Sequence, residues 1–370
     1  MASDRSFLSA GHEGNGAAMV TISLCMIVRN EEAVLARCLD SVSDLVDEII
    51  IVDTGSTDAT REIASRYTNR IFDFSWQDDF SKARNFAFSK ATKDYIYSAD
   101  ADEVLDGTNR VRFRELKEVL LPDIEIVQMK YVESENQSVL NADWEYRPKL
   151  YKRQRSFVWI DPVHETVRTE PLVFDSDIEI QHRPQGLHVK RDFSIFATAF
   201  AKDGRLSKKL YSMYATEVYK CGMAEDVHQA ADIFLKVCDR ETIESDLFCK
   251  LCCIIARSAR MLKNDAGFLK YSMKVVSSSP CSEICMELGE YFYAAGDYTE
   301  ASIWFTNAAY ECDAILDIHA GGDMPLLRLA DTYEHMAEAS EDVVAAKEYK
   351  RLAAESRSAA EAWRQPEEQV

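Results

Sequence analysis

The feature that most constrains the fold is an alternation of apolar runs with helical patterns over residues 21–102. The runs at 22–28 (ISLCMIV) and 48–52 (EIIIV) are almost continuously apolar, which is typical of strands buried on both faces. Between them, residues 31–45 repeat apolar side chains at helical spacing. Further elements continue the pattern: strands at 70–74 and 94–99, a helix capped by Ser56 or Thr57, and a helix at 81–91. This alternation predicts parallel pairing with right-handed crossovers, and therefore a nucleotide-binding α/β layer.

The alternation of strands and helices ends after Asp102. Four later segments are predicted to be antiparallel or mixed strands, namely 124–132, 146–151, 157–160 and 177–182. From about Phe193 onward the chain has almost no strand signal and is rich in Ala, Leu, Tyr and Glu. We therefore expect three parts: a flexible leader at 1–20, an α/β domain at 21–192 and an all-α domain at 193–370.

One segment of the helical part matches a known repeat. Its residues fall at the offsets of a tetratricopeptide repeat, namely Leu288, Gly289, Phe292, Gly296, Tyr298, Ala301, Phe305 and Ala308. A looser copy follows at 329–349. Small residues in such a repeat let paired helices approach, and aromatic residues fill the groove between them.

Composition excludes several classes of protein. The chain has 370 residues, of which 47% are hydrophobic, and 8 prolines, so it is neither disordered nor collagen-like and is long enough for two domains. The net charge of -20 disfavours binding to nucleic acid or to an anionic membrane surface. No apolar run approaches the roughly 20 residues of a membrane helix. Asp4 and Glu13 interrupt what would be a signal peptide, so a cytoplasmic, reduced protein is expected.

The cysteines allow two interpretations. Cys249, Cys252, Cys253, Cys281 and Cys285 are spaced closely enough to suggest zinc. They lie within helical apolar patterns and lack a paired knuckle, so small core residues are the preferred interpretation.

Polar residues follow each of the first four predicted strands. Asp100 and Asp102 come after the fourth strand, where carboxylates suit Mg²⁺ or Mn²⁺ and such an ion could bridge a diphosphate. Asp53 ends the second strand and could accept a hydrogen bond from a base N–H. Asn30 and Glu31 follow the first strand, whereas Arg84 and Asn85 lie on the helix after the third. Ligands of open α/β sheets bind beyond the carboxyl ends of the strands, so these groups are expected at one rim.

The set ISLCMIVRNEE, EIIIVDTGSTD, FSKARN and SADADE resembles the family-2 nucleotide-sugar glycosyltransferases of GT-A fold. The resemblance is close over residues 21–104 and thinner to about 165. With the repeats behind it, the whole chain is similar to the tetratricopeptide-bearing branch that includes the sublancin-type peptide S-glycosyltransferases. It implies a GT-A (Rossmann-like) α/β domain followed by an all-α tetratricopeptide-like domain.

The resemblance also implies roles for individual residues. A nucleotide sugar, usually a UDP-sugar, would be bound by Val28, Asn30, Glu31, Asp53, Arg84, Asp100 and Ala101. Asp102, with Asp100, would hold Mn²⁺ or Mg²⁺. Downstream, YRPKLYKRQRSFVWIDPVHETV resembles a segment of that branch that ends in W-x-x-x-V-H-E. His164 would complete the metal shell or contact the diphosphate, and Asp161 or Glu165 would be the base that deprotonates the acceptor.

The implied reaction is transfer of a sugar with inversion of configuration to a peptide or protein side chain, either Cys or Ser/Thr. The helical domain would present the acceptor peptide or form a homodimer. Two alternatives are a non-catalytic repeat scaffold with a relic nucleotide-binding domain, and a haloacid-dehalogenase-type phosphatase, because Asp100–Val104 also fits D-x-D-x-[TV]. The basic cluster formed by Arg147, Lys149, Lys152, Arg153 and Arg155 is predicted either to attract a diphosphate or, slightly preferred, to be a solvated strand face.

Overall fold

The computed structural model describes residues 19–133, 144–155, 157–164, 166–167, 172–183, 189–240 and 243–364. Its first part is built around one mixed sheet in the strand order β3-β2-β1-β4-β7-β6-β10-β5. The strands of this sheet are β1 (Ile22–Val28), β2 (Glu48–Asp53), β3 (Ile71–Asp73), β4 (Tyr95–Ser98), β5 (Glu103–Val104), β6 (Ile126–Glu133), β7 (Trp144–Lys152) and β10 (Val173–His182). A separate small sheet pairs β8 (Trp159–Ile160) with β9 (Thr166–Val167).

The strand pairing confirms the predicted change from parallel strands to antiparallel or mixed strands. β1 pairs in parallel with β2 and β4, and β2 with β3, so their carboxyl ends lie at one edge. β7 is antiparallel to both β4 and β6, whereas β10 is parallel to β6. The second half of the sheet is therefore mixed, as predicted.

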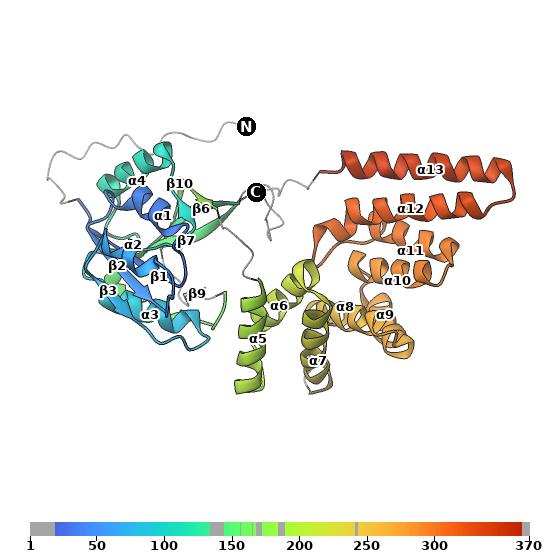
Figure 1. The fold of residues 1–370 in the computed structure, drawn as a ribbon, viewed down its shortest axis with the longest axis horizontal. Coiled ribbons are helices and arrows are strands. Elements are labelled where there is room, and N and C mark those ends of the chain that lie inside the picture. Colours follow the sequence, from blue (N-terminus) through green and yellow to red (C-terminus); the bar gives the residue numbers. More distant parts are fainter. Residues whose placement is uncertain are drawn as a thin grey trace.

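Strand β1 supplies side chains to two cores. Ile22, Leu24 and Met26 belong to one core, which also contains side chains of α1 (Leu35–Val42) and α4 (Gly107–Val119). Cys25 belongs to the other, with side chains of α3 (Phe80–Lys90). Successive side chains of a strand point to opposite faces, so a strand covered by helices on both sides is apolar along most of its length. Figure 1 shows α1 and α4 on one side of the sheet and α3 on the other.

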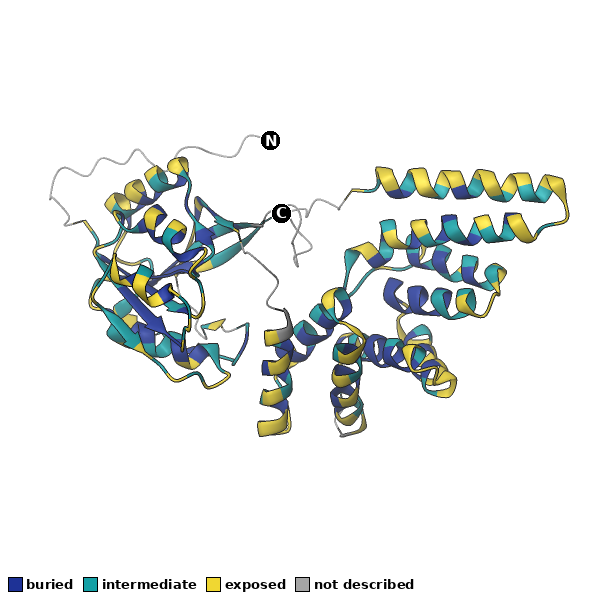
Figure 2. Cartoon of the chain, viewed as in Figure 1, coloured by how far each residue is buried: buried dark blue, intermediate teal, exposed yellow. Residues whose placement is uncertain are grey.

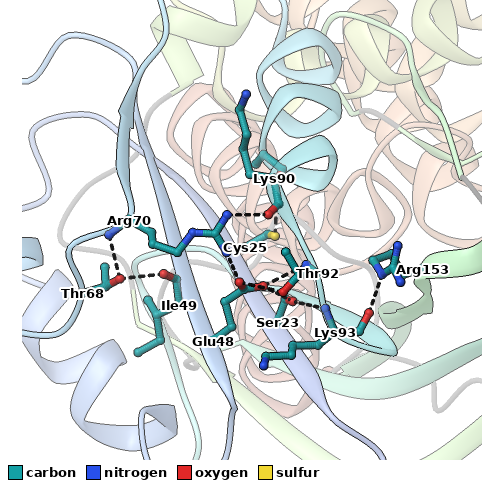
Figure 3. Close-up of polar contacts among 11 residues, drawn as sticks. Ser23, Cys25, Glu48, Ile49, Thr68, Arg70, Lys90, Thr92, Lys93 and Arg153 are labelled. Atoms are coloured by element: carbon teal, nitrogen blue, oxygen red, sulfur yellow. Dashed lines mark hydrogen bonds and ion pairs between the residues drawn. The ribbon is translucent and has the colours of Figure 1, made fainter.

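The end of the sheet that lies opposite those carboxyl ends is held by a polar network around Glu48 (Figure 3). Glu48 pairs with Arg70 and accepts hydrogen bonds from the hydroxyl of Ser23 and from the backbone N–H of Thr92, the latter at 2.9 Å. Arg70 also donates to the carbonyl of Lys90 at 2.9 Å. One largely buried carboxylate thereby connects β1, β2, the start of β3 and the segment between α3 and β4.

One helix of this domain was missed, and one local prediction was wrong. Helix α4 was not predicted, because its sequence GTNRVRFRELKEV is rich in charge and few of its side chains are buried. The predicted capping of the second helix by Ser56 or Thr57 was wrong. Helix α2 (Thr60–Ser65) begins later than expected and has no side-chain cap. The Ser56 hydroxyl accepts a hydrogen bond from the Asn30 N–H at 3.0 Å instead.

The rest of the chain is helical, as predicted. The helices are α5 (Val189–Asp203), α6 (Lys208–Cys221), α7 (Ala224–Arg240), α8 (Ser245–Met261), α9 (Asp265–Ser278), α10 (Ser282–Ala294), α11 (Tyr298–Tyr310), α12 (Asp323–Ala339) and α13 (Val343–Ala362). They share one hydrophobic core, and Figure 2 shows their buried sides facing one another. The predicted domain boundary at 192/193 falls inside α5. None of the described helices combines the length and apolarity needed to cross a membrane.

The cysteines named for a possible zinc site are core residues, which confirms the preferred interpretation. Cys249, Cys252, Cys253, Cys281 and Cys285 are all buried in the core of the helical region. The described part of the chain contains no group of three or more His, Cys, Asp or Glu side chains that could hold a metal ion.

The predicted repeat corresponds to the helix pair α10 and α11. Its looser copy at 329–349 falls on the next pair, α12 and α13. Gly289 on α10 lies against the ring of Phe305 on α11, which is fully buried. A Cβ atom at position 289 would lie only 2.6 Å from Cδ1 of that ring. The absence of a side chain at Gly289 therefore sets how closely the two helices approach.

We expect Gly289→Ala to destabilise the helical region by about 1–2 kcal/mol, because the overpacking penalty exceeds the gain in helix propensity. The midpoint of thermal or urea unfolding measures this loss. Gly107→Ala is the matched control, since nothing lies within 4 Å of a Cβ at that helical position. An unfolding midpoint for Gly289→Ala equal to that of the control would contradict the close contact.

Candidate active site

A cavity of about 890 Å³ lies at the carboxyl ends of β1 and β4, and residues of α5 and α6 line its other side. Seven of the residues singled out in the sequence line it: Val28, Glu31, Arg84, Asp100, Ala101, Asp102 and His164. Three of these follow β4 directly, and two lie at or just after the end of β1. The parallel pairing of β1 with β4 is what brings these two groups together.

Arg84 joins α3 to the end of β4. One guanidinium nitrogen donates to the Ser98 hydroxyl at 3.0 Å, and another donates to Asp100 Oδ1 at 2.9 Å. The guanidinium also lies over the ring of Trp159, 5.1 Å from the ring centroid. Burial alone would raise the pKa of Asp100, but the positive charges of Arg84 and Lys149 hold it well below its usual range. Asp100 is therefore a carboxylate at any physiological pH.

Trp159 is itself held in place by Asn85, the residue after Arg84. The Asn85 side chain donates to the Trp159 carbonyl at 2.9 Å and accepts from the Trp159 N–H at 2.8 Å. This reciprocal pair attaches β8 to α3. Consecutive residues of one helix thus supply the guanidinium that lies over the Trp159 ring and the amide that holds the Trp159 backbone.

Asp102 and Glu31 add negative charge to the same cavity. Asp102 Oδ2 lies 3.0 Å from Nε2 of His182, whose ring packs against Tyr131. Burial, followed by the negative charge of Asp102, raises the pKa of Glu31 to about 7. Carboxylates that disfavour one another's ionisation in this way gain from a bound cation.

The donor set partly fits the predicted divalent ion. Asp100 and Asp102 offer the hard oxygen atoms that Mg²⁺ and Mn²⁺ prefer. Within the described residues no third His, Cys, Asp or Glu joins them in a metal-binding group. Any ion held here would therefore take its other ligands from water or substrate oxygens, as is usual for Mg²⁺ bound beside phosphates.

Three predicted residues are not among those that line the cavity. Asp53 is buried, and its Oδ1 accepts hydrogen bonds from the N–H groups of Gly55 and Ser56 at 3.1 and 2.9 Å. Asn30 has a φ of 57°, and its side chain accepts from the N–H of Thr57 at 2.8 Å. Asp161 has a φ of 72°. The first two shape the loop after β2, and the nucleotide-binding roles of both stay predictions.

The segment that contains Asp161 and His164 connects the two parts of the molecule. The Phe80 N–H at the start of α3 donates to the Pro162 carbonyl at 2.9 Å. Val163 is buried in the core of the helical region. His164 Nε2 lies in contact with the Glu217 carboxylate of α6, so this atom faces a carboxylate of the helical region. Glu165, the other predicted base, lies outside the described residues.

The basic cluster is neither a solvated strand face nor a free attracting patch. Each of its side chains has a partner: Arg147 pairs with Glu145, Lys149 with Glu103 and Arg155 with Glu125, while Lys152 and Arg153 donate to the carbonyls of Pro122 and Lys93. The preferred interpretation was wrong because the neighbouring strands and loops bring carboxylates and carbonyls to these side chains. Arg147 and Lys149 nevertheless line the cavity.

Sequence reasoning missed residues on three elements that line the cavity. His182 ends β10, and its place at a strand end could have identified it. Arg191 and Asp192 on α5, and Lys209 and Glu217 on α6, also line the cavity. No local pattern distinguishes these side chains from the other charged residues of amphipathic helices.

Comparisons with known proteins agree with this geometry. Residues 23–170 match the model of Glycosyl transferase family 2. The chain is 54% identical over 90 residues to a TPR repeat-containing protein of Synechococcus elongatus, a match that covers 24% of this chain and 22% of that protein. It is 30% identical over 177 residues to the SPbeta prophage-derived glycosyltransferase SunS of Bacillus subtilis, covering 46% of this chain and 39% of SunS.

Among solved structures, the chain resembles glucosyl-3-phosphoglycerate synthase from Mycobacterium tuberculosis at 17% identity. The TM-score is 0.36, over 51% of this chain and 80% of that one. A structural likeness this distant transfers no substrate to this chain. The alignments also span less than half the length of the two relatives named above.

The family match disfavours the phosphatase alternative, because the D-x-D motif lies within the residues that match Glycosyl transferase family 2. The predicted fold class is confirmed: a GT-A-like α/β domain precedes a helical region that contains tetratricopeptide-type hairpins. The α/β part of this chain thus carries a match to Glycosyl transferase family 2 over residues 23–170.

Proposed function

We propose that the protein transfers a sugar from a nucleotide diphosphate sugar, with uridine as the base, to the side chain of a peptide or protein. The observation that carries this proposal is the group of Arg84, Asp100 and Asp102 in one cavity at the carboxyl edge of the sheet. Ligands of open α/β sheets bind at this edge, and the family match gives the class of reaction.

Each side of the cavity has a part in this reaction. Arg84 would lie beside the diphosphate, and its fixed geometry suits recognition of phosphate oxygens. Asp102, with Asp100, would hold Mn²⁺ or Mg²⁺, which offsets the negative charge that develops on the leaving diphosphate. Trp159 and Trp76 line the same cavity and offer apolar ring surface to the sugar.

The transfer is a single displacement at the anomeric carbon. The acceptor oxygen or sulfur forms a bond to this carbon while the bond from the carbon to the diphosphate oxygen breaks. The nucleotide diphosphate leaves with the electron pair, and the acceptor proton passes to Asp161 or Glu165 as the base. Attack from the face opposite the leaving group inverts the configuration of the sugar.

The acceptor is proposed to be a hydroxyl or thiol of a peptide, because a helical repeat region adjoins the cavity and such regions commonly bind peptides. A panel of sugar nucleotides, assayed with and without Mn²⁺ for released nucleoside diphosphate, tests the donor. A pool of random peptides containing Cys, Ser and Thr, analysed by mass spectrometry, tests the acceptor. Absence of turnover with every sugar nucleotide would refute the proposal.

We expect Asp102→Asn to lower metal-dependent turnover of the sugar nucleotide by about 100-fold or more, because the neutral amide is a poor ligand for a hard cation. Released nucleoside diphosphate is measured across a titration of Mn²⁺. Asp123→Asn, which changes an exposed carboxylate outside the cavity, is the control and should match the wild type. Equal rates for the two variants would remove Asp102 from the site.

We expect Arg84→Lys to raise the KM for the sugar nucleotide roughly tenfold, because an ammonium group cannot reproduce the planar fork that reaches Ser98 and Asp100 together. Initial rates at varied donor concentration give the KM. Arg66→Lys is the control, since Arg66 is exposed and pairs with Glu62 on the protein surface. An unchanged KM in the Arg84 variant would show that this guanidinium does not contact the donor.

A further inference from the structure

Helix α6 has two faces of different character. Leu210, Tyr211, Tyr214, Ala215 and Val218 are buried in the core of the helical region. The cavity-lining residues of the helix recur at spacings of three and four on its other side, namely Lys209, Ser212, Met213, Thr216 and Glu217. One continuous stripe of α6 therefore forms a wall of the cavity. This wall stands across from the carboxyl ends of β1 and β4.

The same stripe holds the loop that contains His164, at two points. The Lys209 ammonium donates to the backbone carbonyl of His164 at 2.8 Å. The Glu217 carboxylate pairs with Nε2 of the His164 ring. Both the backbone and the ring of His164 are thus held by side chains two turns apart on α6.

The backbone of this loop needs such support. His164 has a φ of 48°, in the left-handed region that costs a non-glycine residue free energy. Its ring also stacks on Phe196 of α5, with centroids 5.8 Å apart. Val163 is only 3% exposed and belongs to the core of the helical region. At His164 and Val163 the loop is therefore held by the helical region, while Pro162 is held by the start of α3.

We propose that α6 forms the acceptor side of the cavity and that Glu217 is a positioning residue, which orients His164 and its loop toward the acceptor hydroxyl or thiol of a peptide. This inference rests on the proposed function and adds that the helical region takes part in the reaction site itself. The side chain of Glu217 is only 12% exposed, and it reaches the cavity from an element distant in sequence from the sheet.

The physical argument is one of geometry. An imidazole held by a carboxylate at one nitrogen has a defined ring orientation, and its neighbours on the loop are held with it. A displacement of about 1 Å in a positioning group can lower a rate by roughly 100-fold. The proposed function places the donor nucleotide beside Arg84, Asp100 and Asp102, so loss of Glu217 should affect transfer to the acceptor more than turnover of the donor.

The test compares transfer to the peptide pool with hydrolysis of the sugar nucleotide in the full-length protein. We expect Glu217→Ala to lower the ratio of transfer to hydrolysis by about tenfold or more. Glu217→Gln retains an oxygen that can accept a hydrogen bond from the ring, and should restore the ratio to within about threefold of the wild type. Glu225→Ala, on the exposed start of α7, is the matched control and should leave the ratio unchanged.

An unchanged ratio in Glu217→Ala, or a ratio equally low in Glu217→Gln, would overturn the positioning role. If Glu217→Ala does not fold, Lys209→Ala replaces it, because that variant releases the same loop at the His164 carbonyl. An unchanged ratio there would also overturn the proposal. Absence of donor turnover in the wild type would instead refute the proposed function. Donor turnover without transfer to any peptide would refute the acceptor side alone.

Discussion

The structure depends on the burial of β1 on both of its faces. Leu24 and Met26 pack beneath α1 and α4, while Cys25 packs on the side of α3. A parallel strand in this position cannot shift its register by one residue without exchanging the side chains that meet the two cores. Its carboxyl end, and that of β4 beside it, are therefore held at one place. The positions of these two strand ends in turn fix the carboxylates that follow them, namely Glu31, Asp100 and Asp102.

The charged side chains of the cavity are held by ion pairs with close neighbours, and the net charge of the chain does not predict their arrangement. The protein carries a net charge of -20, yet Arg84, Arg147 and Lys149 all line this one cavity. Arg84 neutralises Asp100, and Lys149 forms a buried pair with Glu103. Because these pairs are partly or fully removed from water, their interactions are screened less than those of surface ions. The cavity can thus hold several carboxylates in a defined arrangement before any ligand binds.

The two parts of the chain are less separate than their compositions suggest. Trp76 and Phe80, which belong to the α/β part in sequence, pack against the core of the helical region, and Val163 is a member of that core. The loop from Asp161 to His164 therefore has its conformation imposed from both sides. Removal of the helical region would expose these apolar side chains and release the loop, so the α/β domain is best studied within the full chain.

Much of the fold could be predicted from local patterns. The bounds of β1 and β2 were predicted almost to the residue, because a buried parallel strand requires an apolar run of a definite length. The D-x-D pair and Arg84 could be placed at one edge because parallel strands share their carboxyl ends. Helix α4 was not predicted, because only a few of its side chains are buried and its many charged residues obscure the apolar pattern of a helix.

The sequence by itself determined the alternation of strands and helices up to β4, the resemblance of the α/β part to family-2 glycosyltransferases and the repeat in the helical part, because each of these leaves a periodic or contiguous pattern in the chain. Only the tertiary structure decided that the basic cluster is internally paired, that His182 meets Asp102, and that Glu217 and Lys209 hold His164. These contacts join side chains far apart in sequence. They depend on how the sheet and the helices pack, which no local spacing of residues records.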